Sequence, residues 1–113
     1  MNENRPSPTI RKARPAHPVE GLTAILRAEL PRLREQYGVK SLGLFGSYVR
    51  GEQAHESDLD ILVEFDDRPL TLLEFVRLEN ELSDLLGVKV DLVEKMALKP
   101  AIGRRVLEEL VPV

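Results

Sequence analysis

Residues 43–64 read GLFGSYVRGEQAHESDLDILVE, and this stretch combines two strand patterns with a glycine-serine turn. Residues 39–45 form a short apolar run that stops at Gly46, which predicts a buried strand. In residues 59–65 apolar and polar side chains alternate, which is the period of a second strand. Residues 47–51 are expected to form a short helix with Ser47 as its N-cap. The stretch therefore predicts the centre of a small β-sheet.

Amphipathic helices are predicted on both sides of this stretch. In residues 21–37 apolar side chains recur at steps of three and four, although Pro31 removes a backbone donor and predicts a kink or a break. Residues 71–86 show the same periodicity after Thr71 and Glu74, which have the spacing of a capping box. Two helices of this kind each need an apolar surface to cover.

The last part of the chain predicts one more strand and one more helix. The strand is expected at residues 88–93 and the helix at residues 98–110, with three side chains facing inward, namely Ile102, Val106 and Leu110. The order is then helix, strand, short helix, strand, helix, strand, helix. This order predicts an α/β (α+β) domain in which helices pack against a small mixed sheet.

Composition restricts the class of protein. A chain of 113 residues is long enough for one domain, and residues 1–20, rich in proline and basic side chains, are expected to be a flexible tail before a domain at residues 21–113. The formal net charge of -3 argues against nucleic acid as a direct substrate. The absence of cysteine excludes disulfides and thiol catalysis, and no apolar run is long enough for a membrane span, so a cytoplasmic location is expected.

Gly46 and Ser47 are candidates for binding a phosphate group. They follow a strand and precede the expected helix, where free backbone N–H groups and the helix dipole favour an anion. A glycine lets a phosphate approach the backbone, and the serine hydroxyl adds a donor. The alternative is a simple turn with a capped helix, which the sequence leaves open.

Three aspartates are candidates for a metal site. Asp58 and Asp60 are two residues apart, so on a strand both carboxylates project from one face, where Mg²⁺ would relieve their repulsion. Asp91 lies in an otherwise apolar strand, and if that strand neighbours the first, three carboxylates can share two metal ions. The alternative for each is an aspartate on an exposed face. His17 and His55 are too far apart to suggest a zinc site.

These residues resemble the minimal nucleotidyltransferases of the DNA polymerase β-like superfamily. The family pattern is an apolar strand, Gly-Ser, a gap of about ten residues, Asp-apolar-Asp, and later a strand with one more Asp. The resemblance covers roughly residues 21–113. The matching residues are Gly46-Ser47, Arg50-Gly51-Glu52, Ser57, Asp58-Leu59-Asp60 and Asp91.

The resemblance implies a polymerase β palm-like fold and a Mg²⁺-dependent transfer of NMP, with ATP as the expected substrate. Gly46 and Ser47 would hold the β and γ phosphates of a nucleoside triphosphate. Asp58 and Asp60 would bind Mg²⁺, in a site of two ions, and Asp91 would complete it and help to deprotonate the acceptor. Arg50 would either reach the triphosphate or pair with a nearby carboxylate.

The resemblance also implies a protein partner. In this family the frequent companion is a HEPN-domain toxin, whose tyrosine hydroxyl would accept AMP, so this chain is expected to act as an antitoxin. Two alternatives stay open: a catalytically idle module that neutralises its partner by contact, and an adenylyltransferase for a small molecule. The sequence does not indicate an oligomeric state.

Overall fold

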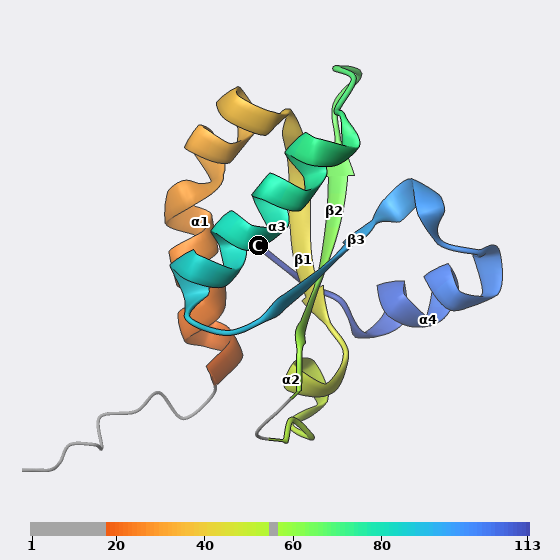
Figure 1. Ribbon diagram of the computed structural model, residues 1–113. Helices are drawn as coiled ribbons and strands as arrows, with labels where there is room; N and C mark the ends of the chain where they lie inside the picture. The colour runs from red at the N-terminus through yellow and green to blue at the C-terminus, as the bar shows by residue number, and fades with distance from the viewer. Residues whose placement is uncertain (1–17, 55–56) are drawn as a thin grey trace, which may run out of the picture.

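A four-stranded mixed sheet is the centre of the computed structural model, which describes residues 18–54 and 57–113 (Figure 1). The strands lie in the order β3-β2-β1-β4. β1 pairs with β2 and with β4 in antiparallel orientation, whereas β2 and β3 are parallel. The mixed α+β architecture predicted from the sequence is confirmed. The strands are β1 (Val39–Phe45), β2 (Leu59–Phe65), β3 (Val90–Glu94) and β4 (Val111–Pro112).

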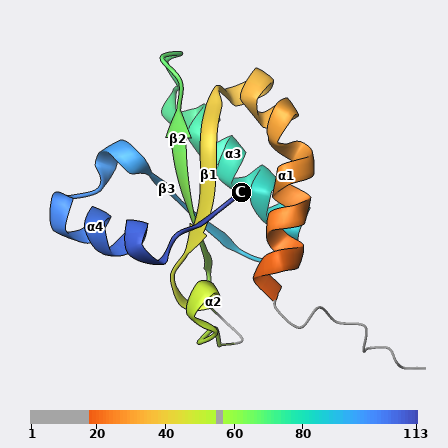
Figure 2. The ribbon, with the colours of Figure 1, turned by 180° about the vertical axis from the view of Figure 1, so that it is seen from behind.

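The two long helices cover one face of the sheet, and the C-terminal helix lies on the other side (Figures 1 and 2). The helices are α1 (Pro18–Tyr37), α2 (Ser47–Arg50), α3 (Leu72–Leu86) and α4 (Pro100–Glu109), with a short 3-10 helix, η2 (Lys95–Ala97), before the last. No helix in the described part of the chain is both long and apolar enough to cross a membrane.

The core lies between the sheet and helices α1 and α3. Three alternate residues of β2 are fully buried there, namely Leu59, Ile61 and Val63. Because side chains alternate along a strand, Asp60 and Glu64 project to the opposite face, where α4 lies. The sheet is thus apolar under its long helices and carries carboxylates on its other face.

Helix α1 differs from its prediction in two ways. It begins at Pro18, so residues 18–20 belong to a helix and not to the tail, and Val19 is buried. The remaining tail residues, 1–17, lie outside the described residues. The helix also runs through Pro31 without a break, because Leu30 and Leu33 on either side are buried against the core and Pro31 itself faces solvent.

Helix α3 confirms its predicted start. Thr71 is the N-cap, its hydroxyl accepts a hydrogen bond from the Glu74 amide, and the Glu74 carboxylate accepts one from the Thr71 amide. β3 begins at Val90, two residues later than predicted, where its pairing with β2 starts. β3 is an edge strand, so some of its amides have no partner strand. Two of these donate to side chains of α3 instead: Val90 to Ser83 Oγ and Leu92 to Glu79 Oε2.

The C-terminal segment corrects three details of the prediction. The helix is shorter than expected, and β4 follows it and pairs with β1. Val106 is buried as predicted, but Ile102 is 52% exposed. Leu110 ends the helix and lies on Gly43, where a Cβ would come within 2.6 Å of its side chain. Short strands such as β4 carry too little periodicity to be recognised in a sequence.

Candidate active site

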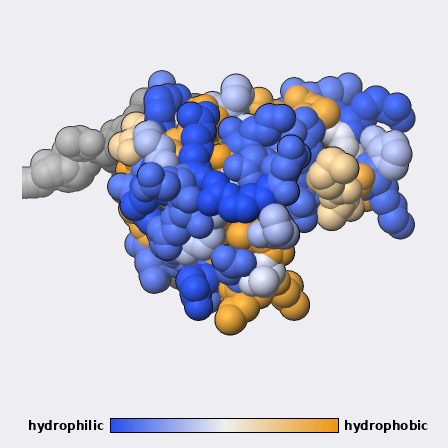
Figure 3. All heavy atoms as spheres, turned by 90° about the horizontal axis from the view of Figure 1, so that it is seen from above, coloured by the Kyte–Doolittle hydropathy of each residue, from blue (hydrophilic) through white to orange (hydrophobic). Residues whose placement is uncertain are grey.

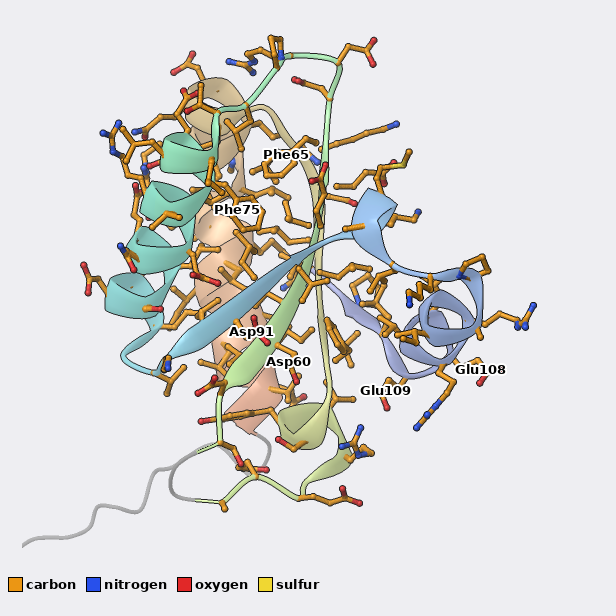
Figure 4. All side chains as sticks on the ribbon, turned by 45° about the vertical axis from the view of Figure 1, so that its right-hand side comes forward. Asp60, Phe65, Phe75, Asp91, Glu108 and Glu109 are labelled. Carbon is orange, nitrogen blue, oxygen red and sulfur yellow. The ribbon has the colours of Figure 1, made fainter. Side chains whose placement is uncertain are left out.

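Asp60 and Asp91 lie side by side on neighbouring parallel strands. They are direct partners in the register of β2 and β3, so their side chains project from the same face (Figure 4). Asp60 is partly buried and Asp91 is exposed. Asp58 comes one residue before β2 begins. The structure therefore joins two residues that are about thirty positions apart, through the crossover that contains α3.

The carboxyl of Asp60 is in an environment that disfavours its charge. Burial raises its pKa from 3.8 to about 6, and the nearby charge of Asp91, a hydrogen bond with Asp91 and the charge of Asp58 act in the same direction. Arg50 acts against them. A divalent cation would relieve this repulsion, and hard carboxylate oxygens suit Mg²⁺. As the side chains stand, no three metal-binding groups within residues 18–54 and 57–113 converge tightly enough to hold an ion.

Position 46, which lies beside Asp60, requires a glycine. It has a φ of +84°, which side chains rarely tolerate, and a Cβ on it would overlap Oδ2 of Asp60. Phe45, the preceding residue, is the register partner of Asp60. The glycine turn therefore lies directly against the carboxylate pair, and the two parts of the sequence pattern meet in space.

Ser47 does not have the predicted capping role. Gly46 is the N-cap of α2, and no side chain caps this helix. Ser47 is instead its first residue, because the chain leaves β1 through Gly46, whose φ is positive, and turns into the helix one position earlier than expected. The hydroxyl of Ser47 is therefore not used for capping.

Glu109 is a site residue that the sequence analysis missed. From the last turn of α4, its Oε2 accepts a hydrogen bond of 2.7 Å from the Gly46 amide, and its Oε1 lies 3.1 Å from Nη1 of Arg50 (Figure 4). Arg50 also donates to Glu52 through Nε at 2.9 Å. Arg50 thus pairs with carboxylates, one of the two possibilities left open. One feature of the sequence could have indicated Glu109: it is an acidic residue at the C-terminus of a helix, where the helix dipole disfavours a negative charge.

The site is separate from a pocket of about 930 Å³ at the opposite end of β2, which both apolar and charged side chains line. Phe65, Leu70 and Phe75 line that pocket, and Leu72, Leu73 and Met96 are exposed at or near it. Figure 3 views this end and shows apolar side chains at the surface. The carboxylates lie at the other end of the sheet, beside α2.

Comparison with known proteins identifies the family. The profile of the nucleotidyltransferase domain matches residues 26–113, which include the Gly46 turn and all three aspartates. The chain belongs to the nucleotidyltransferase domain family. This membership confirms the fold and the enzyme class expected from the sequence, and the protein is a nucleotidyltransferase.

Individual relatives agree with this assignment. The nucleotidyltransferase is 50% identical over 93 residues to the protein adenylyltransferase MntA of Thermococcus cleftensis, a match that covers 82% of this chain and 93% of the relative. It is 41% identical, with a TM-score of 0.70, to a solved structure described as a minimal nucleotidyltransferase, covering 84% and 95% of the two chains.

A second solved structure adds a bound nucleotide analogue. It is a crystal structure of a toxin-antitoxin with AMP-PNP, and the match has a TM-score of 0.60 at 26% identity, covering 82% of this chain and 69% of the other. The nucleotidyltransferase therefore shares its fold with both solved structures, although the second has a longer chain.

Proposed function

We propose that this nucleotidyltransferase transfers AMP from ATP, with Mg²⁺, to a tyrosine hydroxyl of a HEPN-type toxin and so acts as its antitoxin. One observation carries the chemistry. Asp60 and Asp91 are register partners on parallel strands, and Oδ2 of Asp60 lies against Gly46. Phosphoryl-type transfer depends on alignment and on charge neutralisation, and this arrangement provides groups for both.

The carboxylates have distinct roles in the proposal. Asp58 and Asp60 would hold the metal, with Asp91 completing the set; when bound, Mg²⁺ neutralises the charge of the phosphates. Asp91 is the one exposed residue of β2 and β3, so its carboxylate is suited to accept the proton of the acceptor hydroxyl. The hydroxyl oxygen then bonds to the α-phosphorus, the bond to the β-phosphate oxygen breaks, and pyrophosphate leaves.

The nucleotide is assigned from the glycine turn and from the relatives. Gly46 can bring its backbone close to a phosphate because it has no side chain, and Ser47 has a hydroxyl that α2 does not use. The Thermococcus relative is named a protein adenylyltransferase, and the toxin-antitoxin structure contains AMP-PNP. These names support ATP as the donor and a protein as the acceptor.

The test is AMP transfer within a co-expressed pair. The chain is produced with a cognate HEPN toxin, and mass spectrometry should find an AMP mass on a toxin tyrosine. The double variant Asp58→Asn/Asp60→Asn should abolish this modification, whereas Asp67→Asn, an exposed aspartate in the turn after β2, should preserve it.

Two other results would replace the proposal. A tight complex without modification, with full neutralisation by the double variant, would establish the binding-module alternative. Transfer of AMP to a small hydroxylated molecule but not to the toxin would establish the small-molecule alternative. An open site on one sheet holds a free acceptor poorly, which favours an acceptor positioned by its own protein.

A further inference from the structure

Glu109 makes the contacts that an anion would make at this site. Its carboxylate accepts from the Gly46 amide at 2.7 Å and pairs with Arg50 at 3.1 and 3.3 Å. A backbone amide and a guanidinium are also the donors that proteins offer to phosphate oxygens, and carboxylate and phosphate both accept from arginine in this way. The same two donors are therefore available to one anion at a time.

Helix α4 gains little from a glutamate at this position. Glu109 is the last residue of α4, where the negative end of the helix dipole disfavours an acidic side chain, and the last turn of α4 has no basic residue. Its neighbour Glu108 is exposed and points away from the site (Figure 4). The contacts of Glu109 with Gly46 and Arg50 thus offset an unfavourable position in the helix.

Glu109 can leave these contacts without unfolding the segment. Its side chain is 27% exposed, so a rotation about its own bonds can move the carboxylate to solvent. The backbone next to it is held independently, because Leu110 lies on Gly43 and Val111 pairs with Leu44. The exchange of one anion for another requires only a side-chain movement.

We propose that Glu109 is a positioning residue that occupies the place of a nucleotide phosphate. In the absence of nucleotide it holds the Gly46 amide and Arg50 in their binding positions, and a phosphate of ATP displaces it. This inference rests on the proposed function, since it assumes that a triphosphate binds at Gly46. It adds that Glu109 lowers the affinity for ATP, because the phosphate must compete with an attached carboxylate.

The test measures ATP binding by calorimetry in the presence of Mg²⁺. Glu109→Gln keeps the size of the side chain and an oxygen for the Gly46 amide but removes the competing charge. We expect its Kd for ATP to be about tenfold lower than that of the unmodified chain. The matched control is Glu108→Gln, which removes the same charge one residue away and should change Kd less than about twofold.

The outcomes separate this inference from the proposed function. Circular dichroism first establishes that both variants are folded. Equal or weaker ATP binding by Glu109→Gln, or equal tightening in both variants, would overturn the role of Glu109 and leave the transferase assignment intact. Absence of ATP binding in all three proteins would overturn both, because no nucleotide would then reach Gly46.

Discussion

At the residue scale, Gly46 satisfies two independent constraints. Its φ of +84° is a conformation that other residues rarely adopt. In addition, a Cβ at this position would overlap the carboxylate of Asp60. Gly51, at the other end of α2, has a φ of +72° but open space where a Cβ would lie. The two glycines therefore allow backbone strain to be separated from the contact with the carboxylate.

We predict that Gly46→Ala abolishes most activity, whereas Gly51→Ala does not. Both should lose stability, by about 1–3 kcal/mol each, because alanine is strained at positive φ. Only Gly46→Ala also pushes Asp60 from its place, and a misplacement of this kind should reduce AMP transfer by about a hundredfold. Urea unfolding and single-turnover transfer assays check this. Equal activity losses in the two variants would show that strain alone matters.

Asp60 should make the stability of the metal-free protein depend on pH. Its pKa in the folded chain, about 6, lies above the ordinary value of 3.8, so the folded state binds the proton more tightly. The resulting stabilisation is fully present below pH 3.8 and is lost as the pH rises through about 6. At pH 7 the ionised Asp60 therefore destabilises the fold.

We predict that Asp60→Asn is more stable than the unmodified chain at pH 7 in the presence of a chelator. The difference should shrink as the pH falls from about 7 to 4, because the aspartate is then protonated. Thermal unfolding between pH 4 and 7 measures it, with Asp67→Asn as the control for loss of a surface charge. A stability difference that does not change with pH would contradict the raised pKa of Asp60.

At the scale of elements, the starts of α2 and α3 differ, although the sequence predicts a hydroxyl side chain as the N-cap of each helix. Thr71 caps α3, whereas Ser47 caps nothing. We predict that Thr71→Ala destabilises the fold by about 1 kcal/mol. Ser47→Ala should change stability by less than about 0.5 kcal/mol, yet weaken ATP binding. Urea unfolding and calorimetry on both variants give the comparison, and a large loss of stability in Ser47→Ala would restore its capping role.

The elements that the sequence predicted well are those whose causes are local. The capping box of Thr71 and Glu74 and the alternation in β2 each depend on a few neighbouring residues, and both are found in the structure. The continuity of α1 through Pro31 depends instead on the burial of its apolar stripe against the sheet. Propensity predicted a kink or a break, and tertiary packing prevented the break.

The candidate site divides in the same way. The Gly-Ser turn and the three aspartates match the spacing of a known family, and through that resemblance the sequence predicted them as one site. The contact of Glu109 with Gly46 joins residues 63 positions apart. No local sequence pattern around either residue predicts its contact with the other. Only the fold, through the placement of α4 by Leu110 and β4, brings them together.

At the scale of the whole molecule, β2 separates two surfaces with different properties. Asp60 lies near its start, and Glu64 and Phe65 at its end line the pocket of about 930 Å³. We predict that Leu73→Lys, at an exposed position near that pocket, leaves the Kd for ATP within about twofold of its original value. Calorimetry with ATP and Mg²⁺ checks this. A larger change would show that the two ends of the sheet are coupled.

The pairing of β4 with β1 also affects how the chain folds during synthesis. β1 is complete by residue 45, but the strand that covers its outer edge is made only at residues 111–112. Until then a growing chain that has already paired β1 with β2 exposes a row of free backbone groups. Neighbouring nascent chains on one messenger RNA could add their own strands at this edge. Slow translation of the codons between β2 and β4 should therefore increase aggregation more than slow translation of the codons before β1.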